Sequence, residues 1–193
     1  MIKSPLNYTG GKYKLLPQIL PLFPKENEYT TFVDLFCGGC NVAVNIHGKP
    51  VVANDYSTQL IDIYKYFQET GKEQVYKDIQ FVNKSFELVA IHEGYFVYCD
   101  CPYLISTATY NEQGGWTEYH EHLLLESLDL FNSRGIKFAL SNVLEHKGQE
   151  NKILKDWSKK YNVHFLNKRY DNCSYQVKDK YQNETQEVLI TNY

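Results

Sequence analysis

Short apolar runs of strand type alternate with helical segments along this chain, and that alternation constrains the fold more than any other feature of the sequence. The run at 95–99 is apolar or aromatic throughout, which is typical of strands buried on both faces of a parallel sheet. We therefore predict an α/β fold, a doubly wound parallel sheet that binds ligands at the carboxyl ends of its strands. The predicted strands are 32–36, 50–54, 95–99, 136–141, 163–166 and 185–191, and the predicted helices are 40–46, 58–69, 118–132 and 148–160.

The length of 193 residues predicts a single domain, 1–193, because one core can serve a chain of this size. A composition of 43% hydrophobic and 22% charged residues is that of an ordinary globular protein. We find no apolar run of about 18 residues and no apolar signal region at the start, so we expect a soluble, cytoplasmic protein without a membrane partner. The five cysteines are expected to be reduced.

Charge is distributed unevenly along the chain. Residues 93–132 carry seven Asp or Glu and no Lys or Arg, whereas residues 146–180 carry nine Lys or Arg against four acids. This basic segment is equally compatible with a solvated helix face and with a surface that binds a polyanion. If it binds nucleic acid, the residues expected to contact phosphates are Lys168, Arg169, Lys178 and Lys180.

A glycine-containing turn follows the first predicted strand. Its candidate ligand-binding residues are Asp34, Phe36, Gly38 and Gly39. Glycines there let a ligand approach the backbone, and Asp55 follows the second strand, where an acid can bind both hydroxyls of a ribose. Together they indicate an adenosine-containing cofactor, although a packing turn and a capping Asp remain the structural alternative. The GxGxxG spacing is absent, which disfavours NAD.

The third strand is followed by Asp100-Cys101-Pro102-Tyr103, and with this motif the chain resembles a known family. It is similar to the alpha-group N6-adenine DNA methyltransferases of the Dam and FokI-methylase type. Residues 7–12 resemble the N-terminal cofactor motif of that class, residues 34–39 its glycine turn, Asp55 its ribose-binding acid, and residues 100–103 its catalytic Asp-Pro-Pro-Tyr motif. The order of the four motifs also agrees with the class.

The resemblance implies a Rossmann-like class I fold with an antiparallel edge, and transfer of methyl from S-adenosylmethionine to N6 of an adenine flipped out of duplex DNA. Asp100 would accept one N6–H, the carbonyl of Cys101 the other, and Tyr103 would stack on the base. Tyr8 and Lys12 would contact the cofactor, as would Asp100. Transfer would be direct, without a metal or a covalent enzyme intermediate. The class also implies restriction-modification, with a cognate endonuclease as a partner.

The chain departs from the family pattern in two places. Cys101 replaces the first proline of the catalytic motif and loses the fixed φ that orients the carbonyl. The segment 70–94 is short at the place where family members insert a target-recognition region, so we interpret it as a remnant of that insertion. Two alternatives stay open: methylation of adenine in RNA or single strands, and an inactive module that binds the cofactor or DNA. Sequence specificity would be relaxed, supplied by a separate subunit, or lost.

Metal binding is disfavoured by the sequence. Cys37 and Cys40 have CxxC spacing, but no second ligand pair accompanies them. Three residues of metal-ligand type lie close together in the sequence at Glu118, His120 and His122. Alternate residues point to different sides of a helix, so we expect these side chains to be solvated.

Overall fold

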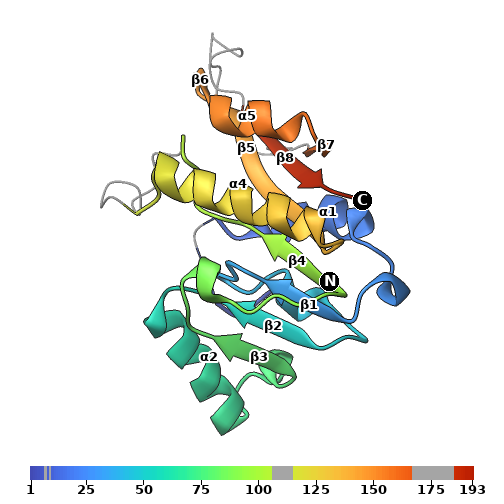
Figure 1. The fold of residues 1–193 in the computed structure, drawn as a ribbon. Coiled ribbons are helices and arrows are strands. Elements are labelled where there is room, and N and C mark those ends of the chain that lie inside the picture. Colours follow the sequence, from blue (N-terminus) through green and yellow to red (C-terminus); the bar gives the residue numbers. More distant parts are fainter. Residues whose placement is uncertain (7, 9, 106–114, 167–184) are drawn as a thin grey trace.

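The computed structural model describes residues 1–6, 8, 10–105, 115–166 and 185–193, and these form one sheet covered by helices (Figure 1). The strands lie in the order β3-β2-β1-β4-β5-β8-β7, and β6 pairs with β5. Within the described ranges, no helix is long and apolar enough to cross a membrane. The strands are β1 (Thr31–Asp34), β2 (Val51–Asn54), β3 (Ile79–Val82), β4 (Tyr95–Cys99), β5 (Lys137–His146), β6 (Gln149–Glu150), β7 (Asn162–Leu166) and β8 (Thr185–Thr191).

The first five strands run parallel, and the last ones form an antiparallel edge. β1 pairs in parallel with β2 and β4, β2 with β3, and β4 with β5, while β8 lies antiparallel between β5 and β7. The direction of winding reverses between β1 and β4, which are in register at Asp34 and Tyr98. A ligand crevice forms at such a reversal point, beyond the carboxyl ends of the strands.

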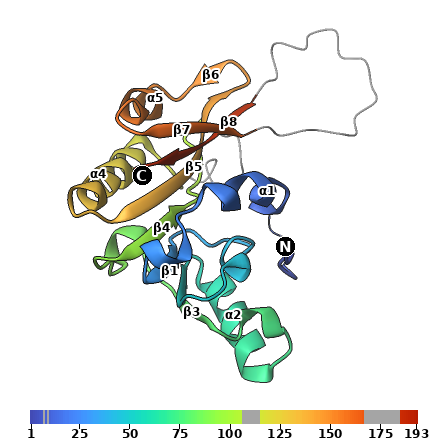
Figure 2. The same ribbon diagram turned by 90° about the vertical axis from the view of Figure 1, so that its right-hand side faces the viewer.

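Helices cover both faces of this sheet. α1 (Leu16–Ile19) and α2 (Thr58–Thr70) pack on one face, and α4 (Glu118–Ser133) and α5 (Lys152–Ser158) on the other (Figure 2). Successive side chains of β4 pack alternately into the hydrophobic cores on the two faces of the sheet, because side chains in a strand point to opposite faces. The short 3-10 turns are Lys12–Leu15, Leu20–Leu22, Glu26–Glu28, Ala43–Asn45, Gln74–Tyr76 and Phe86–Leu88.

The predicted α/β sheet with an antiparallel edge is confirmed. β4 and β8 have the predicted bounds, and Ser57 caps α2 by accepting a hydrogen bond from the Leu60 N–H at 3.4 Å. β3 was not predicted, because its four residues lie in 70–94, which we had interpreted as part of a recognition remnant.

Two predicted helices are wrong in whole or in part. Residues 40–46 contain a single 3-10 turn, since Cys40 has a left-handed φ of 61° and the side chains of Asn41 and Asn45 bind the N-terminal segment instead of solvent. The helix predicted over 148–160 begins at Lys152, because Gly148, with φ 77°, turns the chain into the β5–β6 hairpin.

Candidate functional site

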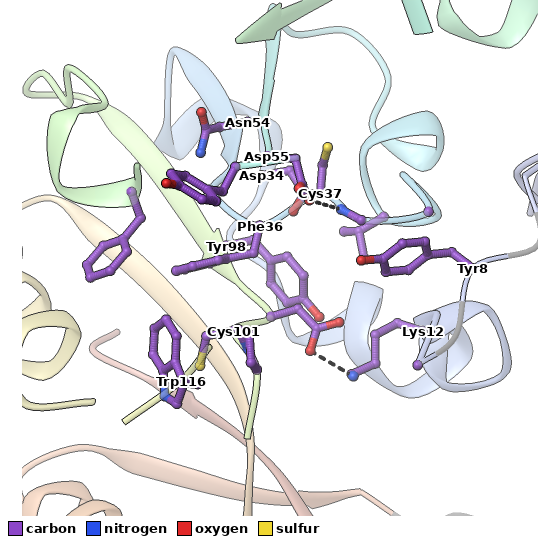
Figure 3. A pocket seen from close by; sticks show the side chains of 18 of the residues that line it. Tyr8, Lys12, Asp34, Phe36, Cys37, Asn54, Asp55, Tyr98, Cys101 and Trp116 are labelled. Atoms are coloured by element: carbon purple, nitrogen blue, oxygen red, sulfur yellow. Dashed lines mark hydrogen bonds and ion pairs between the residues drawn. The ribbon is translucent and has the colours of Figure 1, made fainter. Parts of the chain in front are cut away.

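A cavity of about 870 Å³ opens at the carboxyl ends of β1, β2, β3 and β4, and its size lies within the range of small-molecule sites (Figure 3). The segments that follow these four strands supply most of its wall. Every described residue that we predicted to bind the cofactor or act in catalysis lines this cavity: Tyr8, Lys12, Asp34, Phe36, Gly38, Gly39, Asp55, Asp100, Cys101, Pro102 and Tyr103.

Tyr8 packs against the glycine turn after β1. A Cβ built on Gly39 would lie 2.7 Å from the Cβ of Tyr8, and one built on Gly38 would lie 2.9 Å from its ring. Gly38 also has a φ of 43°, so a side chain at either position would collide with Tyr8 or strain the backbone. The turn therefore requires its glycines for the close approach of an aromatic side chain from the N-terminal segment.

Asp55 is held by backbone donors at the end of β2. Its Oδ2 accepts the Gly38 N–H at 2.9 Å, and its Oδ1 accepts the Ser57 N–H at 2.8 Å. Burial raises the pKa of Asp55, and these two bonds oppose that rise. Each carboxylate oxygen can accept more than one hydrogen bond, so the arrangement fixes the orientation of Asp55 and leaves capacity for a ligand hydroxyl.

Asp34, at the end of β1, is a buried carboxylate with an oxygen that lacks a donor. The residue is 2% exposed, and its Oδ1 has no hydrogen-bond partner among the described residues. Burial raises the pKa of Asp34 well above its usual value, and the nearby charge of Asp100 adds to the rise. Unpartnered buried groups are costly, so this oxygen indicates a ligand that brings a hydrogen-bond donor or a positive charge.

Asp100 and Lys12 form an ion pair in the cavity wall. Lys12 Nζ lies 2.7 Å from Asp100 Oδ1, and the lysine side chain is 6% exposed (Figure 3). The same ammonium lies 2.6 Å from the Tyr103 hydroxyl. Burial raises the pKa of Asp100 in spite of the lysine, whereas the Asp100 charge raises the pKa of Lys12 against the effect of burial. The structure therefore brings Lys12 to the catalytic motif; its predicted contact with the cofactor stays a prediction.

Cys101, which replaces proline in the motif, is buried. Its Sγ accepts a contact from Asn142 Nδ2 at 3.6 Å, which is a weak bond for a thiol. Burial raises the pKa of this thiol well above its usual value, and the Glu121 carboxylate raises it further. Cys101 is therefore a protonated thiol fixed by its neighbours, not an activated nucleophile.

Glu121 of α4 links Trp116 to α5. It is fully buried and accepts 2.8 Å hydrogen bonds from the Trp116 indole N–H and from Asn151 Nδ2. Trp116 lines the cavity and meets Phe36 edge to face, with ring centroids 5.7 Å apart. His120, expected to be solvated, also lines the cavity, and its Nδ1 lies 2.9 Å from the Thr117 hydroxyl at the start of α4.

Sequence reasoning missed several cavity residues. Those after β3 were missed with the strand itself, although the alternation of apolar Ile79 and Phe81 with polar Gln80 was a signal for it; they are Lys84, Ser85, Phe86 and Glu87. Lys168, Arg169, Lys178 and Lys180 lie outside the described residues. No group of three or more His, Cys, Asp or Glu within the described ranges could hold a metal ion.

Comparisons with known proteins relate this chain to a family. The model of the D12 class N6 adenine-specific DNA methyltransferases matches residues 8–95 and 78–172. Type II methyltransferase M.FokI of Planomicrobium okeanokoites is 34% identical over 283 residues, covering 100% of this chain and 43% of that protein. Modification methylase StsI of Streptococcus sanguinis is 34% identical over 285 residues, with the same coverage. The chain therefore spans less than half the length of these relatives.

A solved structure supports the fold. The methyltransferase domain of the bacterial protein CtHen1-CN superposes with a TM-score of 0.55 at 14% identity, covering 94% of this chain and 98% of that one. This similarity confirms the predicted Rossmann-like methyltransferase fold.

Proposed function

This chain belongs to the D12 class of N6 adenine-specific DNA methyltransferases, and on that premise we propose that it methylates the N6 of a flipped adenine in DNA. The observation that carries the proposal is the position of Asp100. Its carboxylate follows β4 at the cavity wall, where its Oδ1 lies 2.7 Å from Lys12 Nζ and 3.3 Å from the Tyr103 hydroxyl, and the glycine turn after β1 lines the same cavity. We also propose a cytoplasmic location.

The cavity fits S-adenosylmethionine, which supplies the methyl group when bound. Asp34 Oδ1 is the oxygen without a donor, and the α-ammonium of the cofactor would provide one. Asp55 would accept the ribose hydroxyls beside the glycine turn, and Tyr8 would cover that turn. Phe86, after β3, would contribute an apolar surface for the adenine ring of the cofactor.

Asp100 and its neighbours would bind and orient the target base. N6 of adenine is a poor nucleophile because its lone pair is delocalised into the ring, so hydrogen bonds that polarise the amine and hold it in line do most of the work. Asp100 would accept one N6–H, and the main-chain carbonyl of Cys101 the other. Tyr103 would stack on the ring. S-adenosylmethionine would supply the methyl group, and the Asp100 carboxylate would accept the proton that N6 loses and pass it to solvent.

We further propose that the chain lacks a target-recognition insertion between β3 and β4. The alignment with the FokI methylase runs over 283 residues, 90 more than the 193 of this chain. The family model matches in two segments that overlap at 78–95, which supports a gap in this interval. A separate specificity subunit would then select the sequence, and a restriction endonuclease would be the cognate partner.

The test is transfer of labelled methyl groups from S-adenosylmethionine to unmethylated duplex DNA. We expect N6-methyladenine with the native chain and none with Asp100→Ala, while Asp129→Asn, where α4 contacts α5 and outside the described cavity wall, serves as the matched control with native activity. Cys101→Pro, assayed in parallel, isolates the motif: activity in that variant alone would locate the defect at Cys101. Full activity of Asp100→Ala would refute the mechanism.

A second candidate function is methylation of adenine in RNA or single-stranded DNA, favoured by the 90 positions that the chain lacks. The same assay with single-stranded DNA and RNA as acceptors separates it from duplex methylation. Tight cofactor binding without transfer to any acceptor would instead identify an inactive binding module. The replacement of the motif proline by Cys101 favours this alternative.

A further inference from the structure

Glu187 is a buried carboxylate that contacts Tyr103 of the catalytic motif. It belongs to β8, in register with Val143 of β5 and Leu166 of β7, and is 3% exposed. The described part of the cavity wall does not include it. A carboxylate is rarely buried unless it is paired, so its surroundings require an explanation.

Two residues of the candidate active site contact Glu187. Its Oε1 accepts a hydrogen bond from the Tyr103 hydroxyl at 3.3 Å and lies 3.6 Å from Lys12 Nζ. Tyr103 and Lys12 both contact Asp100 Oδ1, at 3.3 Å and 2.7 Å. One ammonium and one phenol thus bridge two carboxylates that come from different strands of the sheet.

We propose that Glu187 is a positioning residue for methyl transfer, which acts through Lys12 and Tyr103 to hold the Asp100 carboxylate in its working orientation. The inference rests on the proposed function. It is carried by the three elements that meet at this point: the turn before α1, the segment after β4, and β8.

The contacts explain why a second carboxylate is useful here. Lys12 and Tyr103 both bind Oδ1 of Asp100, and this leaves Oδ2 as the oxygen that can receive an N6–H donor. An ammonium paired with Asp100 alone would neutralise the acceptor. With Glu187 sharing that ammonium, the cluster keeps a formal charge of one negative, which favours the positive charge that develops on N6 during transfer.

Glu187 also contacts the hydroxyl of Tyr103, the same atom that contacts Asp100. The Tyr103 hydroxyl accepts a hydrogen bond from Lys12 Nζ at 2.6 Å and can donate its single proton to Asp100 or to Glu187, each at 3.3 Å, so these contacts hold the ring before any base arrives. A ring held in place loses less conformational entropy when a base stacks on it.

The kinetic test uses Glu187→Gln, which keeps the shape and removes the charge. We expect kcat to fall by about tenfold or more while the Kd for S-adenosylmethionine stays within about twofold, because Glu187 acts on the base site. In a Tyr103→Phe background the same substitution should lower kcat by a much smaller factor, since the hydroxyl that links Glu187 to Asp100 is gone. Asp129→Asn is the control carboxylate. The proposal would be overturned if Glu187→Gln left kcat unchanged, or if it weakened cofactor binding as much as it lowered kcat. It would also be overturned if the factors by which Glu187→Gln and Tyr103→Phe lower kcat simply multiplied in the double variant.

A second measurement does not depend on activity. Glu187→Gln should lower the Tm of the native chain, but it should raise the Tm of Lys12→Met, where two carboxylates share a buried site without their cation. If the native chain transfers no methyl group, the proposed function fails, and this reversal of sign still decides whether Glu187 holds Lys12. Equal Tm shifts in the two backgrounds would refute the proposal.

Discussion

Replacing Asp34 by Asn should make the protein more stable and at the same time weaken its binding of the cofactor. The carboxylate is 2% exposed, its Oδ1 has no partner among the described residues, and its pKa is raised by burial and by Asp100. An uncompensated buried polar group costs about 1–3 kcal/mol, and more when it is charged. Because the amide removes the charge but keeps the shape, we expect the free energy of unfolding to increase by about 1–2 kcal/mol.

The gain should depend on pH. A carboxyl group whose folded-state pKa is raised binds its proton more tightly in the folded protein, so the stability of the native chain falls as pH rises from the unfolded value toward the folded one. The amide does not titrate. The difference in Tm between Asp34→Asn and the native chain should therefore be small at acid pH, grow through this window and level off above it.

Thermal unfolding followed by circular dichroism measures this effect. At 2–4 °C for each kcal/mol in a protein of this size, Tm should rise by about 2–8 °C at pH 8. Titration calorimetry should show an affinity for S-adenosylmethionine about 10- to 150-fold weaker, the equivalent of a charge-assisted hydrogen bond worth about 1.5–3 kcal/mol.

Asp129 supplies the matched control. Its carboxylate accepts hydrogen bonds from Trp157, Lys160 and Tyr161 at 2.6–2.9 Å, so Asp129→Asn should lower Tm and leave the cofactor affinity unchanged. A lower Tm for Asp34→Asn, together with native affinity, would refute the reasoning that Asp34 is kept for a cationic ligand at a cost in stability.

Three further predictions concern single side chains. Gly39→Ala places a Cβ 2.7 Å from the Cβ of Tyr8 and should weaken cofactor binding by about tenfold in calorimetry, because Tyr8 must move; native affinity would contradict this. Cys101 should resist iodoacetamide at pH 8 in the folded protein and react after unfolding, as peptide mass spectrometry can follow, since burial raises its pKa. Leu124→Ala, at a fully buried position of α4, should cost about 2–5 kcal/mol and lower Tm by roughly 4–20 °C; a fall of less than about 2 °C would show that Leu124 is not a core residue.

The sequence by itself determined the fold class and the order of the motifs. The bounds of β4 and β8 agree with the prediction because apolar periodicity is a local property, and every described residue predicted to bind the cofactor or act in catalysis lines the cavity. Parallel strands place the turns that follow them at one edge of the sheet, so Asp34, Gly38 and Asp55 could be assigned to one site from the sequence. Tyr8, Lys12 and the motif at 100–103 were assigned to it by resemblance to the family.

The tertiary structure alone decided which of these residues contact one another. No local pattern indicates that Lys12 would meet Asp100, or that β8 would place Glu187 beside both Lys12 and Tyr103. The helix predicted over 40–46 was lost because Cys40 adopts a positive φ, and β3 was missed because a strand of four residues is recognised by its pairing with β2. Burial, pairing and charge compensation are properties of the packed chain, because they depend on neighbours that the order of residues does not specify.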